Sequence, residues 1–157
     1  MRPTAIVVVV LLVAACAKQE KAPAADTAMA APAAVAPAPP PPFSLAAAAG
    51  KWEYVAKSAT GDTVLVKAEL TATADTAGWT ILLPGRKVLA LKVSVGGDSV
   101  MTSVGPYESV LRKGVQVTTE SMLRMVDSKL VGTSTAHYST KSADSVRHLV
   151  IEATRKP

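Results

Sequence analysis

The feature that most constrains the fold is an alternation of apolar and polar side chains, with a period of two residues, beyond Gly50. Three segments show it most clearly, and their apolar positions are Val64, Val66, Ala68 and Leu70; Leu89, Leu91, Val93 and Val95; and Val115, Val117, Leu123 and Met125. Such alternation places one set of side chains on a buried face and the other toward water, as in a β-strand. No segment after Gly50 sustains a helical period. The pattern therefore predicts an all-β domain over residues 44–157.

Short turn signals separate the alternating segments: Thr60-Gly61-Asp62, Pro84-Gly85-Arg86, Gly96-Gly97-Asp98, Arg112-Lys113-Gly114 and Asp127-Ser128. The segments between them predict eight strands, over 51–58, 62–73, 78–83, 87–95, 98–111, 115–126, 129–139 and 145–155. Gly105-Pro106 predicts a bulge or break in the fifth of these strands. Because every connection has hairpin length, the strands should pair as an antiparallel meander. Eight such strands close most economically into an up-and-down barrel, which leaves no exposed edge; a two-sheet β-sandwich is the alternative.

The first fifteen residues have the three parts of an export signal. Arg2 supplies a positive charge, residues 5–13 form an unbroken apolar run, and the small residues Ala14 and Ala15 follow. The uncharged stretch spans 13 residues, from Ala5 to Ala17. A membrane-spanning helix needs about 18–20. The sequence therefore predicts a cleaved signal peptide over residues 1–15.

The residues Val13-Ala14-Ala15-Cys16 resemble the lipobox of bacterial lipoproteins. In that family a diacylglyceryl group is attached to the cysteine thiol, cleavage makes the cysteine the first residue, and an acyl chain usually joins its amine. Two or three acyl chains anchor a protein durably to a membrane. We therefore expect lipid attachment at Cys16, the only cysteine of the chain. The sorting rule of that family reads the next residue, and Ala17 favours the outer membrane over the inner, with the domain in the periplasm or at the cell surface.

Residues 16–43 are dominated by alanine and proline and include four consecutive prolines, 39–42. Such a composition buries little apolar surface and predicts a disordered, extended tether. Residues 44–50 then predict one short helical turn, with Ser44 capping its start and Gly50 at its end. The expected organisation is a signal peptide (1–15), a lipid-anchored tether (16–43) and a β-barrel domain (44–157).

The residues Gly50-Lys51-Trp52 resemble the Gly-x-Trp motif with which lipocalins and lipocalin-like domains begin their first strand. The resemblance covers three residues and the strand count, and the later signature motifs and C-terminal helix of that family are absent. It implies a barrel whose closed end is plugged by Trp52. It also implies that an arginine of the last strand covers this ring, and Arg155 occupies the corresponding position. The resemblance further gives Gly50 a structural role.

In an eight-stranded meander, alternate turns share one rim, and in lipocalin-like barrels the rim of the first, third, fifth and seventh turns is the open mouth. Five basic residues fall in these turns: Arg86, Lys87, Arg112, Lys113 and Lys141. Over an apolar interior (Val64, Val66, Leu89, Leu91 and Leu123), such a rim would suit a small anionic amphiphile such as a fatty acid. The alternative is a barrel filled by its own side chains. We expect this second case, with a structural or protein-interaction role and an envelope protein as partner.

Charge and motifs exclude several other classes of protein. The net charge is +5, but both signs are dispersed, and the clusters of basic and aromatic residues typical of nucleic-acid binding are missing. Gly97-Asp98-Ser99-Val100 resembles the nucleophile block of a hydrolase family, yet it stands at a turn before a strand and the matching Asp-x-x-His is absent. His137 and His148 lack carboxylate or thiol neighbours that would complete a metal site. The sequence thus predicts a cell-envelope lipoprotein without enzymatic activity, cofactor or metal.

Overall fold

The structure is a computed structural model that describes residues 40–157. These residues form the short helix α1 (Leu45–Ala48) and nine strands: β1 (Gly50–Ser58), β2 (Val64–Ala72), β3 (Thr80–Leu82), β4 (Leu89–Ala90), β5 (Lys92–Gly96), β6 (Ser99–Glu108), β7 (Gln116–Val126), β8 (Lys129–Tyr138) and β9 (Val146–Arg155). No helix in this part of the chain is long and apolar enough to cross a membrane. The predicted signal peptide, Cys16 and the tether up to residue 39 lie outside the described residues.

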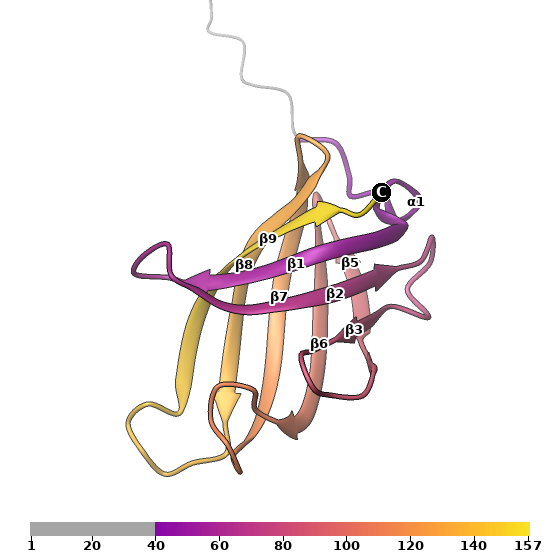
Figure 1. Ribbon diagram of the computed structural model, residues 1–157. Helices are drawn as coiled ribbons and strands as arrows, with labels where there is room; N and C mark the ends of the chain where they lie inside the picture. The colour runs from indigo at the N-terminus through magenta and orange to yellow at the C-terminus, as the bar shows by residue number, and fades with distance from the viewer. Residues whose placement is uncertain (1–39) are drawn as a thin grey trace, which may run out of the picture. The chain divides into compact units, whose positions relative to one another are not determined.

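The strands form one antiparallel sheet, in the order β4-β3-β2-β1-β9-β8-β7-β6-β5, that curls into a nearly closed barrel (Figure 1). Only Leu91 separates β4 from β5, and its N–H donates to the carbonyl of Trp79. The two ends of the sheet therefore belong to one interrupted strand, so the barrel is nearly closed. The predicted all-β up-and-down barrel is confirmed, with one of the eight expected strands divided in two. The sandwich alternative is wrong.

The closed end of the barrel carries α1 and the C-terminus (Figure 1). Ser44 caps α1, because its hydroxyl accepts a hydrogen bond from the N–H of Ala47 at 3.2 Å. The N–H of Phe43 donates to the carbonyl of Gly97 at 2.9 Å, and its ring packs against the core. Phe43 stood at the end of the expected tether. An aromatic ring that finds apolar neighbours gains by burial, and the domain accordingly begins before Ser44.

Two irregularities change which side chains point inward. Gly105-Pro106 lies at a break in the register between β6 and β7, as predicted. A second bulge was not predicted: Ala56 pairs with Val66 but Lys57 pairs with Val64, so Leu65 is the extra residue. An extra residue reverses the side-chain alternation beyond it. The prediction that Val64 lines the interior is therefore wrong, and its side chain is 44% exposed.

The core fills the closed end and reaches the middle of the barrel. Its fully buried large side chains come from six strands and from the connection between β2 and β3, and they are Trp52, Leu70, Trp79, Val100, Leu123, Leu130 and Ile151. Gly132 occupies an inward position of β8, where a Cβ atom would collide with the backbone carbonyl of Met122. Glycine thus lets β7 and β8 approach closely enough for the sheet to bend at this point. Between Gly132 and the open end, the side chains fill the barrel interior less completely.

Candidate functional site

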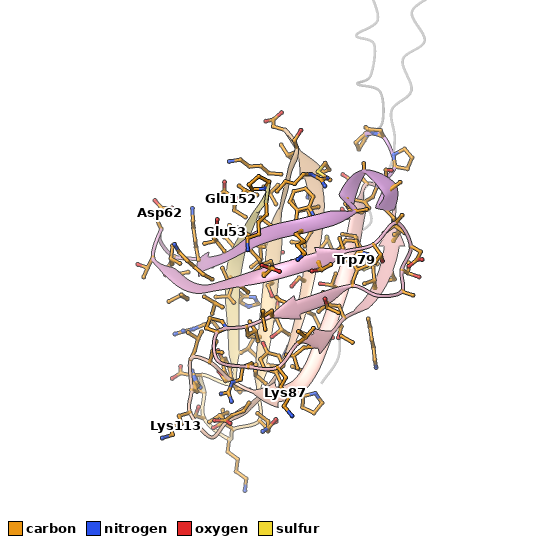
Figure 2. The ribbon with its side chains drawn as sticks, turned by 45° about the vertical axis from the view of Figure 1, so that its right-hand side comes forward. Glu53, Asp62, Trp79, Lys87, Lys113 and Glu152 are labelled. Carbon is orange, nitrogen blue, oxygen red and sulfur yellow. The ribbon has the colours of Figure 1, made fainter. Side chains whose placement is uncertain are left out.

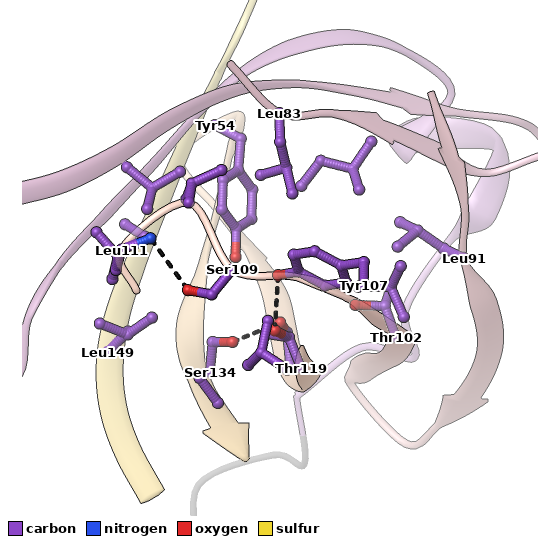
Figure 3. A pocket seen from close by; sticks show the side chains of 18 of the residues that line it. Tyr54, Leu83, Leu91, Thr102, Tyr107, Ser109, Leu111, Thr119, Ser134 and Leu149 are labelled. Atoms are coloured by element: carbon purple, nitrogen blue, oxygen red, sulfur yellow. Dashed lines mark hydrogen bonds between the residues drawn. The ribbon is translucent and has the colours of Figure 1, made fainter. Parts of the chain in front are cut away.

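The barrel contains a partly open cavity of about 60 Å³ between the apolar core and the open end (Figure 3). Its walls come from strands all round the barrel and from residues 83, 91 and 109–111. The lining is largely aliphatic, and it contains no Asp, Glu, Lys, Arg or His side chain. A cavity of this kind can hold an uncharged group but offers no counter-charge to an ion.

A belt of hydroxyl groups crosses the cavity walls, formed by Tyr54, Thr102, Tyr107, Thr119, Ser121 and Ser134. We call these six residues the hydroxyl belt. The hydroxyl of Ser121 donates to Oγ of Ser134 at 2.9 Å, and that of Ser134 donates to the carbonyl of Glu120 at 3.2 Å. The hydroxyls of Tyr107 and Thr119 lie 3.0 Å apart. Buried polar groups destabilise a core unless they are hydrogen-bonded. Here they bond mainly to one another.

The two tyrosines of the belt remain neutral far above physiological pH. Burial raises the pKa of Tyr54 to about 12, although hydrogen bonding with Ser121 and Ser134 lowers it in part. Burial also raises the pKa of Tyr107, against a smaller opposing effect of Thr119. The hydroxyl of Tyr54 points into the cavity (Figure 3). Each phenol can therefore donate and accept a hydrogen bond, but neither supplies a charge.

Residues 109–115, which we call the mouth loop, cover the cavity at the open end. The predicted strand 98–111 is three residues too long, because β6 ends at Glu108. Ser109 is only 3% exposed, and its hydroxyl accepts hydrogen bonds from the N–H groups of Leu111 at 3.0 Å and Arg112 at 3.1 Å. These bonds turn the chain inward. Val110 and Leu111 consequently line the cavity from above.

Arg86 fastens the start of the mouth loop. Its guanidinium donates to Oε2 of Glu108 at 3.1 Å and to the carbonyl of Ser109 at 3.3 Å. The other carboxylate oxygen of Glu108 accepts from the N–H of Gly114, also at 3.1 Å. The hydrogen bond and charge of Arg86, together with the N–H of Gly114, lower the pKa of Glu108. One carboxylate thus joins the two ends of the loop to the turn that contains Arg86.

Arg112 holds the mouth loop on its other side, with its guanidinium 4.3 Å from the centre of the Tyr138 ring. The two arginines predicted to bind an anionic head group therefore contact the protein itself, and neither lines the cavity. Lys87, Lys113 and Lys141 are exposed. Figure 2 shows Lys87 and Lys113 at the end of the barrel opposite α1. The structure brings the basic residues to one end, but it leaves them outside the cavity.

The closed end contains the predicted structural group. Trp52 is fully buried, and its indole N–H donates to the carbonyl of Ala48 at 2.9 Å. The guanidinium of Arg155 lies 4.4 Å from the centre of this ring. It also donates to the carbonyls of Ala49 at 2.5 Å and Ala47 at 2.6 Å. A Cβ atom at Gly50, whose φ is 138°, would collide with the same guanidinium. This group joins α1, β1 and β9, and it leaves no space for a ligand.

The hydroxyl belt was not predicted from the sequence, although the sequence contains a signal for it. Thr119 and Ser121 occupy inward positions between Val117 and Leu123 in β7, where a filled barrel would carry aliphatic residues. The sequence contains no comparable signal for the mouth loop. Its contacts with Arg86 and Tyr138 join residues 20 or more positions apart, and only the closed sheet brings these together.

Residues 40–157 contain no group of three or more His, Cys, Asp or Glu side chains that could hold a metal ion. His148 lies opposite Thr135 on the outer face, with 3.3 Å between Nδ1 and the threonine hydroxyl. No protein-family model matches the chain, and comparisons with curated proteins and with solved structures also return no match.

Proposed function

We propose that this protein is a lipoprotein of the bacterial cell envelope, anchored through Cys16, whose barrel has a structural or protein-interaction role and holds no lipid in its interior. The export signal, the lipobox and the Ala/Pro-rich segment of the sequence support the anchoring. The observation that carries the role of the barrel is its nearly filled interior, which the mouth loop partly covers.

The size of the cavity argues against a lipid ligand. Sites for drug-sized molecules usually measure about 300–1,000 Å³, whereas this cavity measures about 60 Å³. Because one water needs about 10–15 Å³ of such space, the cavity has room for about four to six waters. The acyl chain of a fatty acid would fit only if the mouth loop and the side chains beneath it were displaced.

The charges at the mouth lead to the same conclusion. An anionic head group would compete with Glu108 for Arg86 and with the Tyr138 ring for Arg112. The three lysines remain, but exposed charge pairs are worth only about 0–1 kcal/mol. A barrel that is plugged at one end and covered at the other is well suited to present its outer surface to a partner.

A fluorescent fatty-acid titration of residues 40–157 tests this proposal. We expect no saturable binding, because the interior lacks the volume. The competing function is the binder of a small anionic amphiphile, which the gathering of basic residues at the mouth favours. In that case the wild type would bind, and Arg86→Ala/Arg112→Ala would weaken binding about 10- to 100-fold, more at low salt than at high. Tight stoichiometric binding by the wild type would contradict the proposal.

A further inference from the structure

We infer that the hydroxyl belt and the mouth loop form a gated site for a small, uncharged, hydroxyl-rich molecule such as a short polyol. The inference goes beyond the proposed function, which concerns the outer surface and the exclusion of lipids. It rests on the lining of the cavity, on its size and on the contacts that hold the mouth loop.

The hydroxyl belt is not what the packing of a filled barrel requires. Ser121 and Ser134 face each other on β7 and β8, with Leu123 and Ala136 at adjacent inward positions. Aliphatic residues could occupy the same space without burying polar atoms, and well-packed cores normally use them. The hydroxyls come from β1, β6, β7 and β8 and all line the same cavity. Their convergence from separate strands is the arrangement that a polar ligand needs.

The chemistry of the lining defines the class of ligand. Every hydroxyl can both donate and accept a hydrogen bond, so the belt can exchange its internal bonds for bonds to a molecule of the same kind. The nearest charges at the mouth, Arg86, Glu108 and Arg112, are engaged with the protein and lie outside the cavity. An ion would lose its hydration there without gaining a counter-charge. The site therefore favours neutral polar molecules.

The size of the cavity narrows the class further. Space for about four to six waters corresponds to a molecule of similarly few non-hydrogen atoms, such as a diol, or glycerol with its six. The aliphatic walls suit the carbon atoms of such a molecule, and the belt suits its hydroxyls. A sugar or a lipid would be too large for the covered cavity.

The mouth loop is the part of the wall that can move without disturbing the sheet. It contributes Val110 and Leu111 to the lining but has no strand pairing of its own. Two side chains fasten it from outside the cavity: Arg86, which bonds Glu108 and the carbonyl of Ser109, and Arg112, which stacks on Tyr138. The ends of the loop are joined to each other by the N–H of Ser109, which donates to the carbonyl of Val115 at 2.8 Å. Both arginines are partly exposed, and contacts of this kind are individually weak. Opening this loop would uncover the hydroxyl belt from above.

The test is a titration of ¹⁵N-labelled residues 40–157 with glycerol, and in parallel with glycerate, an anion that is larger by one oxygen atom. We expect saturable amide shifts centred on Thr119, Ser121 and Ser134 with glycerol only. Ser121→Ala/Ser134→Ala should weaken binding at least tenfold, whereas the outer-face change Ser94→Ala should leave it unchanged. Circular dichroism and the dispersed amide spectrum would verify that each variant is folded.

A separate measurement tests whether the mouth loop gates the site. Glu108→Gln removes the ion pair with Arg86 without touching the cavity, and it should accelerate both association and release of glycerol, as read from exchange line widths. If the exchange rate of glycerol is the same in Glu108→Gln and in the wild type, the proposal that the mouth loop gates the site is wrong. If glycerol causes no saturable shifts, the cavity holds only water and the proposed binding site is wrong. If glycerate binds as tightly as glycerol, the proposed preference for uncharged ligands is wrong. None of these results bears on the exclusion of lipids, which the fatty-acid titration tests separately.

Discussion

Replacement of Arg155 by alanine should destabilise the barrel by about 1.5–3 kcal/mol. The guanidinium stacks on Trp52 at 4.4 Å and donates to the carbonyls of Ala47 and Ala49. A cation–π contact contributes about 0.5–2 kcal/mol. A hydrogen bond to a charged group contributes about 1.5–3 kcal/mol when buried. Because the guanidinium is largely solvated, we take the two carbonyl bonds together at about 1 kcal/mol.

The assay is urea unfolding of residues 40–157 followed by tryptophan fluorescence. Arg147→Ala is the matched control, because Arg147 is also exposed on β9 and such a change should stay within about 0.5 kcal/mol. Arg155→Lys should fall between the two, since an ammonium keeps the charge but not the planar fork that reaches both carbonyls. Equal stabilities of Arg155→Ala and Arg147→Ala would refute the structural role of the stack.

Three further predictions concern other parts of the chain. Cys16→Ser should abolish incorporation of labelled palmitate, and labelling that persists would contradict the lipobox. Gly132→Ala should cost at least about 1–3 kcal/mol in urea unfolding, because its Cβ would collide with the Met122 backbone; Gly61→Ala, which has open space, should be nearly neutral. Because the pKa of Tyr54 rises from 10.0 to about 12 on folding, stability should be fully present below pH 10 and fall as the pH rises toward 12. Tyr54→Phe should remove that fall in an alkaline unfolding series, and an unchanged pH dependence would contradict the burial of this phenol.

The barrel could be predicted because its determinants are local. Side-chain alternation marks each strand, and hairpin-length turns dictate which strands pair. The contact between Trp52 and Arg155 was expected on other grounds, from the resemblance to lipocalins, and the two residues pair directly in the structure. The bulge at Leu65 could not be predicted, because a single extra residue leaves the composition of the segment unchanged and reverses only the alternation on one side of it.

The mouth could be predicted only in part. The turns that contain Arg86 and Arg112 follow from the strand count, and so does their common end of the barrel. The partners of the two arginines do not, because Glu108 and Tyr138 come from other strands and depend on where β6 ends. That end is set by the hydroxyl of Ser109, which bonds its own backbone two and three residues on. Any serine can form such bonds with its own backbone, so the sequence alone does not show which serine ends a strand.

Native mass spectrometry of residues 40–157, produced in a bacterial envelope and released under gentle conditions, tests the central claim that the barrel interior is closed to lipids. The account predicts the mass of the polypeptide alone, apart from species as small as water or a short polyol, because the cavity measures about 60 Å³. A stoichiometric adduct with the mass of a fatty acid or phospholipid, lost on unfolding, would contradict it.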